Sequence, residues 1–148
     1  MIATTASTHV ARSLSVRSID ATAEKFKTTA TLYWRRGAIQ FSKTAQTAIV
    51  FSAGHVVTAS KFGVILVQVN DAGTISTKVP GSPQAYNTAP LALAALPEAD
   101  TGNLAIGYIA IAAKAATWTA NTDDLTNGSD LTTATFNNVA AASLPAAL

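Results

Sequence analysis

The sequence predicts an all-β fold: a single β-sandwich or jelly-roll-like barrel with one short helix and an extended N-terminal arm. Segments rich in Val, Ile and Thr recur along the chain, turn-forming residues separate them, and a single segment suits a helix. The 148 residues suffice for one domain with a buried core. We therefore expect an arm over residues 1–22 and a β-sandwich domain over residues 23–148.

The first 22 residues alternate Ser, Thr, Ala and Val, without a helical stripe or a large aromatic residue. Such a segment buries too little apolar area to offset the entropy lost on ordering. We expect this arm either to lack fixed structure or to become ordered only against a neighbouring molecule.

Two short strands are expected within residues 30–41, bent at Arg35-Arg36-Gly37. In the first strand Leu32 and Trp34 share one face, because successive side chains of a strand alternate between its two faces. Residues 43–50 run from polar to apolar and are expected to form a further strand.

The clearest local signal is a β-hairpin over residues 63–79. Residues 63–69 and 74–79 are dominated by Val, Ile and Thr, which pack well on a pleated surface. Between them, residues 70–73 (NDAG) supply short polar side chains and a glycine, which favour a turn.

The predicted helix covers residues 90–96. Thr88 is a suitable N-cap, Pro90 is tolerated in the first turn because its position needs no N–H donor, and Pro97 ends the helix.

Three more strands are expected, at residues 103–113, 116–120 and 131–139, with a polar loop at 121–130. In residues 103–113, Leu104, Ile106 and Tyr108 share one parity, whereas Ile109 and Ile111 have the other, unless Gly107 marks a bulge that resets the register. Apolar residues on both faces indicate burial on two sides.

Composition and charge point to an interacting protein. Charged residues are only 12% of the chain, about half of the usual share, which suits a surface that neighbours partly cover. Residues 1–62 carry a net charge of +6 and residues 63–148 a net charge of −4. The basic groups are not interleaved with aromatic residues, so we do not expect nucleic acid as a partner. No segment is long and apolar enough to predict a membrane span.

One stretch of the sequence, around His55, is similar to a catalytic motif. The stretch Ser52-Ala53-Gly54-His55 resembles the turn around the general base of trypsin-like proteases, which also need a serine nucleophile and an orienting carboxylate. The nearest serine candidate, Ser129, has the wrong flanking residues. We therefore expect His55 to be structural, and the protein not to be an enzyme.

No cofactor or metal site is predicted. The chain has no cysteine and only two histidines, without metal-ligand spacing. Acidic residues of the 121–130 loop lack the regular alternation of a calcium-binding loop. Aromatic residues could stack on sugars but are more often core or interface anchors. The acidic residues of this loop are Asp123, Asp124 and Asp130, and the aromatic residues are Trp34, Tyr86, Tyr108 and Trp118.

Three blocks, taken in order, carry a family resemblance. Residues 59–78 form a strand that ends in N-x-x-G-T and returns. Residues 92–113 hold an LP step followed by GYI-x-I, and residues 118–139 run from an aromatic through T-x-x-L to a final T-x-T-F strand. This order resembles the head decoration, capsid cement or head-fibre proteins of tailed bacteriophages.

The resemblance implies a β-sandwich, jelly-roll-like domain on the outer surface of the virion capsid, where it would bridge major capsid subunits. Its expected partners are the major capsid protein and other copies of itself, as a dimer or trimer. The basic residues proposed for capsid or inter-subunit contact are Arg12, Arg17, Arg35 and Arg36. The alternative is a fibre or tail-associated module that binds a host surface glycan through exposed aromatics, including Trp118, and the 121–130 loop.

Overall fold

The all-β class is confirmed by the computed structural model, which describes residues 12–13, 19–52, 54–126 and 131–138. Within these ranges the pairings between strands are antiparallel, and the finer assignment to a β-sandwich or jelly-roll barrel stays a prediction. The elements are β1 (Arg12–Ser13), β2 (Ile19–Thr22), β3 (Lys25–Thr28), β4 (Leu32–Arg36), β5 (Ile39–Lys43), β6 (Val56–Val57), β7 (Phe62–Asn70), β8 (Ile75–Lys78), α1 (Ala89–Ala94), β9 (Asn103–Ala113), β10 (Trp118–Thr119) and β11 (Leu131–Asn138).

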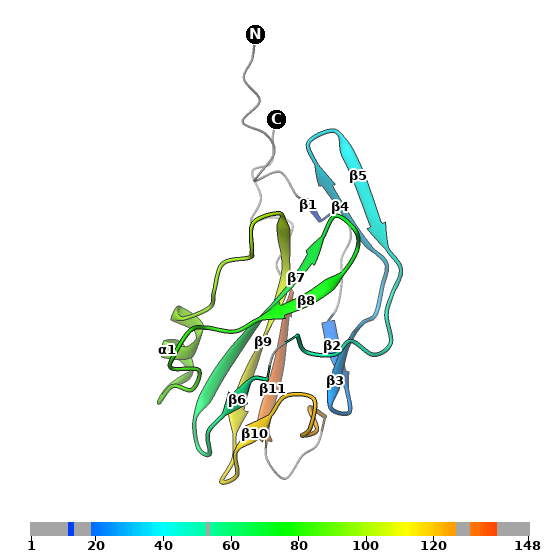
Figure 1. The fold of residues 1–148 in the computed structure, drawn as a ribbon. Helices are drawn as coiled ribbons and strands as arrows, with labels where there is room; N and C mark the ends of the chain where they lie inside the picture. The colour runs from blue at the N-terminus through cyan, green and yellow to red at the C-terminus, as the bar shows by residue number, and fades with distance from the viewer. Residues whose placement is uncertain (1–11, 14–18, 53, 127–130, 139–148) are drawn as a thin grey trace.

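A four-stranded sheet with the order β11-β9-β7-β8 is the centre of the molecule. A three-stranded sheet, β1-β4-β5, and two ribbons, β2-β3 and β10-β6, accompany it. Helix α1 lies on one side of the four-stranded sheet, whereas β2, β3, β4 and β5 lie on the other (Figure 1). We call the side that carries α1 the outer face.

Strand β7 is buried on both of its faces. Ile65, Val67 and Val69 belong to the hydrophobic core, together with Trp34 and Phe26 from the facing strands. The alternate residues Val64, Leu66 and Gln68 point to the outer face and are also buried. The continuous apolar run of this segment therefore reflects cover on two sides.

Strand β9 contains the bulge that the sequence suggested near Gly107. Val67 of β7 pairs with Gly107, but the next residue, Gln68, pairs with Ala105, so Ile106 is the extra residue. This insertion brings Ile106 and Ile109 into the same core despite their opposite parity. Tyr108, which has the parity of Ile106, lies instead on the outer face, where it lines a groove.

The hairpin over residues 63–79 is confirmed as β7 and β8. Its turn is closed by the Asn70 side chain, whose Oδ1 accepts from the Thr74 N–H at 2.9 Å. Gly73 has a φ of 80°, a conformation that favours glycine because it has no Cβ. The helix is confirmed at Ala89–Ala94, and Thr88 is its N-cap as predicted.

The second hairpin, β4-β5, is also confirmed, with its turn slightly later than predicted. Arg35 and Arg36 lie within β4, and the chain turns at Gly37, whose φ is 60°. Trp34 and Phe41 are direct cross-strand partners whose rings stack with centroids 5.6 Å apart.

The strand expected over residues 43–50 is wrong. Lys43 is the last residue of β5, and beyond it Ile49 makes an isolated bridge to Phe26 of β3. The Phe26 N–H and carbonyl both bond to Ile49, at 3.3 and 2.7 Å. Thr28 holds Gln46 in addition: its N–H donates to the Gln46 carbonyl at 2.9 Å, and its Oγ1 accepts from the Gln46 N–H at 3.0 Å. The segment is therefore fixed at two separate points rather than along a continuous ladder.

The predicted boundary between arm and domain at residue 22 is also corrected. Strand β2 pairs with β3, so the boundary would cut through a hairpin. Ile19 is only 3% exposed and is part of the core. It packs next to Gly107, where an added Cβ would lie 2.6 Å from Ile19 Cδ1. Residues 19–22 are therefore part of the body of the protein.

The edge of the four-stranded sheet at β8 carries a reciprocal side-chain contact. The Thr77 N–H donates to Ser52 Oγ at 2.8 Å, and the Ser52 N–H donates to Thr77 Oγ1 at 2.9 Å. This pair fastens the segment before β6 to the edge of the sheet.

Candidate functional site

Small side chains create a depression on the outer face of the four-stranded sheet. Ala110 and Ala112 of β9 lie between larger neighbours, with Val64 beside Ala110 and Phe62 beside Ala112. On the opposite flank, Thr135 pairs with Ala110 and Thr133 follows the same face of β11 towards its start. The two alanines therefore form a low floor between β7 and β11.

Helix α1 forms one wall of this depression. The Thr88 hydroxyl accepts from the Leu91 N–H at 3.4 Å, and Pro90 stands in the first turn. Ala92 is buried, so the helix sits close to the sheet, whereas Leu91 and Leu93 remain 54% and 47% exposed. Of these two leucines, Leu93 lines the depression, and Leu91 is exposed elsewhere on the helix.

Together these elements enclose an apolar groove with a volume of about 400 Å³. Polar groups stand mainly at its β11 border, where Thr133 and Thr135 are exposed, and at Tyr108 and Asn137. A concave apolar surface with a few polar side chains is typical of binding sites. The groove is therefore the candidate functional site.

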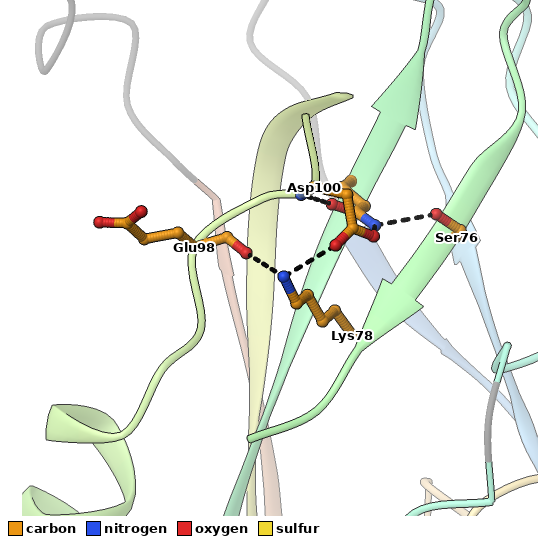
Figure 2. Close-up of polar contacts among 5 residues, drawn as sticks. Ser76, Lys78, Glu98 and Asp100 are labelled. Atoms are coloured by element: carbon orange, nitrogen blue, oxygen red, sulfur yellow. Dashed lines mark hydrogen bonds and ion pairs between the residues drawn. The ribbon is translucent and has the colours of Figure 1, made fainter. Parts of the chain in front are cut away.

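The other end of the outer face is closed by polar contacts (Figure 2). Gln68 is buried in β7, and its amide holds Asp100 at two points: Nε2 donates to Oδ2 at 2.6 Å, and Oε1 accepts from the Asp100 N–H at 2.8 Å. Lys78 of β8 lies 2.7 Å from Asp100 Oδ1 and donates to the carbonyl of Glu98 at 3.0 Å. Ser76 completes the cluster through Gln68 Nε2 at 3.3 Å.

This cluster fixes the segment between α1 and β9 against the sheet. The hydrogen bonds from Lys78 and then from Gln68 lower the pKa of Asp100, since they favour its charged form. The side chains of Gln68, Asp100, Lys78 and Ser76 are each engaged by another member of the cluster, and Glu98 takes part through its backbone carbonyl. The arrangement therefore satisfies a buried amide and anchors a loop. The cluster lies at one end of the outer face and does not offer a free reactive group.

The four arginines predicted for contacts have different positions. Arg35 is exposed on β4. Arg36 is engaged within the molecule: its Nε lies 2.7 Å from Asp71 Oδ2, and its Nη2 donates to the Gly102 carbonyl at 2.6 Å. Arg12 pairs through its backbone with β4, and Arg17 lies outside the described residues.

The contacts of Arg36 have a structural role. Its side chain is only 16% exposed, and its carboxylate partner, Asp71, also accepts from Trp34 Nε1 at 3.4 Å. Strand β4 is thereby held against both the β7-β8 turn and the turn that ends at Gly102. Arg36 has little free capacity for a partner protein, so Arg35 is the better remaining candidate among the described residues.

His55 does not lie in a catalytic arrangement with described residues. Its ring is fully buried against Trp118, and neither ring nitrogen has a hydrogen-bond partner in the described part of the chain. Burial lowers the pKa of His55 to about 4. A weaker interaction of the ring with the Gln84 side chain, outside normal hydrogen-bond geometry, opposes this shift. Ser129, the serine weighed as nucleophile, lies outside the described residues.

The acidic loop makes local contacts. Asp123 Oδ2 accepts from the Thr119 N–H at 2.6 Å, and Asp124 Oδ1 accepts from both the N–H and the hydroxyl of Thr126. Asp130 lies outside the described residues. No group of three or more metal-ligating side chains is found in the ranges that the structure describes.

Sequence reasoning identified the strands that carry the groove but not the groove itself. Its floor depends on which face of β9 holds Ala110 and Ala112, and the bulge at Ile106 decides that. The one available signal was the row of alanines between larger residues in 103–113. The contact of α1 with β7 and β9 is long-range and left no local pattern.

The chain matches no protein-family model, no curated protein and no solved structure. Among the described residues, no helix is long and apolar enough to cross a membrane.

Proposed function

We propose that this protein is a phage capsid decoration, or cement, protein that binds the outer surface of the assembled head. It would bridge major capsid subunits there, as a dimer or trimer with a β-sandwich or jelly-roll-like body. The proposal needs no catalytic group. A ligand that binds only the assembled shell stabilises that state by mass action, which is how such a protein would strengthen a capsid.

The resemblance that motivates the proposal falls on a coherent part of the fold. The first block, residues 59–78, supplies β7 and β8. The second, residues 92–113, runs from α1 through β9, and the third, residues 118–139, contains β10 and β11. The three blocks together build the whole four-stranded sheet and part of its outer face, so the resemblance concerns one structural unit.

The observation that carries the proposal is the groove with exposed Leu93 in its wall and exposed Leu91 on the same helix. Exposed leucines next to an apolar depression are a typical surface for binding another protein, since burying them removes apolar area from water. We assign this face to the capsid contact. Exposed Arg35, in the basic part of the chain, would add attraction to an acidic shell.

The glycan-binding alternative requires Trp118 to be exposed, and the structure buries it. Trp118 is 0% exposed and packs against Phe51, with ring centroids 6.0 Å apart. The other tryptophan, Trp34, is also buried in the core. A sugar could not stack on either ring while the fold is intact.

The test is co-sedimentation of the purified protein with assembled phage heads that lack it. The wild-type protein is expected to pellet with heads, and the double variant Leu91→Glu, Leu93→Glu to bind on the order of 10-fold more weakly, because charges would be buried at the contact. The matched control is Val50→Glu, another exposed apolar residue (53%) that does not line the groove.

Cryo-electron microscopy of the virion then gives the position of the chain. Many copies spread over the head surface are expected. A tail position, absence from the particle, or equal binding by the double variant and Val50→Glu would contradict the proposal.

A further inference from the structure

His55 stands where a short ribbon joins the body of the protein. It precedes β6, and its carbonyl accepts from the Ala120 N–H at 2.9 Å, which extends the pairing of β6 with β10. Its ring meets the edge of Trp118 with centroids 6.3 Å apart. Gly63 makes room for this ring, because a Cβ there would lie 3.1 Å from His55 Nε2.

The buried polar atoms at this junction are not satisfied within the described residues. Both nitrogens of His55 and Nε1 of Trp118 are buried without hydrogen-bond partners. A neutral imidazole tolerates this arrangement better than an imidazolium, which would bury a full charge with two unpaired donors. Proton uptake in place is therefore strongly disfavoured.

The charged groups of the surrounding elements make other contacts. Lys61, before β7, donates from Nζ to Asn87. Tyr86, from the segment bonded to Phe62, donates its hydroxyl to the Pro83 carbonyl. Beyond β10, Asp123 accepts from the Thr119 N–H at the end of that strand, and Asp124 accepts from Thr126. Lys114, between β9 and β10, is exposed.

None of the charged and titratable groups of these elements contributes to the pKa of His55. Burial lowers this pKa, and Gln84 partly offsets the effect of burial. Within the described residues, no carboxylate is therefore in place to stabilise the imidazolium. A protonated ring gains solvation only by leaving its site.

Leaving that site separates the ribbon from the body. Each strand of the β6-β10 ribbon has two residues, so the pairing is short. The ring of Trp118 lies between His55 and Phe51, and Phe51 in turn packs on Phe26 at 5.1 Å. Displacement of His55 would open this aromatic cluster to water from its ribbon end.

We propose that His55 is an acid-sensitive latch that holds the β6-β10 ribbon closed on the body and releases it when the imidazole binds a proton. Release exposes Trp118 while the four-stranded sheet stays folded. The proposal does not depend on the capsid-binding function, since it concerns a buried junction rather than the groove.

The size of the effect follows from the two protonation equilibria. The ring has a pKa of about 4 when closed and its ordinary value of 6.5 when exposed. The closed state binds fewer protons, so acid favours the open state across this interval. Full protonation shifts the opening equilibrium by on the order of 300-fold. The change sets in near pH 6.5, reaches about half of that factor at pH 4 and is complete only below pH 4.

Amide hydrogen exchange of the full chain tests the latch. Protection of the Ala120 amide and of β6 and β10, corrected for intrinsic rates, is expected to fall on the order of 15-fold between pH 6.5 and 5. The amides of β7 and β9 should keep their protection. Simultaneous loss in ribbon and sheet would overturn the proposal, because it would show global unfolding instead.

The variant His55→Phe removes the titrating group while keeping an apolar ring. Its ribbon protection is expected to be independent of pH over this range, and acid opening equal to that of the wild type would overturn the proposal.

A second measurement applies even if the variant does not fold. NMR titration of the wild-type imidazole, assigned with His9→Gln, is expected to give a pKa well below 6.5, coupled to exposure of Trp118. A pKa near 6.5 with the ribbon still protected would overturn the latch.

Discussion

At the scale of single residues, glycines and one buried amide decide how closely the elements approach. Gly107 lets Ile19 and the backbone of β11 come together beside the bulge. Gln68 would be costly in the outer face of β7 without partners, and Asp100 and Ser76 satisfy it. Both features are visible in the sequence as isolated exceptions within apolar strands, but their partners are not.

Gly107→Ala is expected to destabilise the fold by about 2 kcal/mol, because overpacking forces a shift of neighbouring atoms. The added Cβ would lie 2.5 Å from the Asn137 carbonyl oxygen, which belongs to backbone and cannot rotate away. Urea unfolding measures the change. The control Gly81→Ala meets nothing within 4 Å and should leave the free energy of unfolding nearly unchanged; equal effects would contradict this reading of the bulge.

Acid should weaken the contribution of Asp100 to stability. The pKa of Asp100 is lowered in the folded protein, so the folded state binds fewer protons than the unfolded state. The stability that Asp100 contributes is fully present above its ordinary pKa of 3.8. That stability is lost as the pH falls through the lower pKa of the folded state. Asp100→Asn is expected to be less stable than wild type at pH 7, with the gap narrowing towards pH 3. Denaturant unfolding at both pH values measures the difference in stability between the wild type and Asp100→Asn. A difference that widens in acid would refute the stabilising role given to the Asp100 carboxylate.

At the scale of elements, local patterns predicted those elements whose signals are contained in their own residues. The β7-β8 hairpin has its turn chemistry at 70–73, and α1 has its cap at Thr88. The error at 43–50 has a physical reason: the alternation there fits a strand, but beyond Lys43 the segment meets β3 only at Gln46 and Ile49, without a continuous ladder. Pairing is a long-range property that such a short pattern does not contain.

Helix α1 is short, so its cap should matter. Thr88→Ala is expected to cost about 1 kcal/mol, because it removes the acceptor of the Leu91 N–H. Thermal unfolding measures the loss, and Thr88→Ser, which keeps a hydroxyl, should recover most of it. If Ser and Ala variants behaved alike, the hydroxyl would not be the stabilising group.

At the scale of the whole molecule, the composition indicated an interacting β protein, and the all-β class followed from strand and turn signals. The groove and the boundary of the body could not be predicted. Ile19 lies in a Ser/Thr-rich segment that shows no strand pattern in the sequence. In the structure, however, Ile19 packs against Gly107, which is distant in the chain. Likewise, Ala110 and Ala112 form a floor only because α1 packs beside them.

Truncation distinguishes the predicted arm from the observed body. Removing residues 1–11 leaves every described pairing in place and is expected to leave the free energy of unfolding nearly unchanged. Removing residues 1–22 deletes β2 and the buried Ile19, and should destabilise the fold by roughly 3 kcal/mol or more. Denaturant unfolding of both proteins measures this, and equal stability would restore the boundary at residue 22.

The Ser52–Thr77 pair has a consequence for how copies of this protein can meet. A strand added to the edge of a sheet needs unpaired backbone donors there, and open edges of this kind lead to uncontrolled fibre-like stacking. At β8 the outward N–H of Thr77 is already bound by Ser52 Oγ. An incoming strand would first have to displace a segment of the same chain. Association at high local concentration is thereby directed away from this edge and towards faces, where contacts can close into a defined assembly.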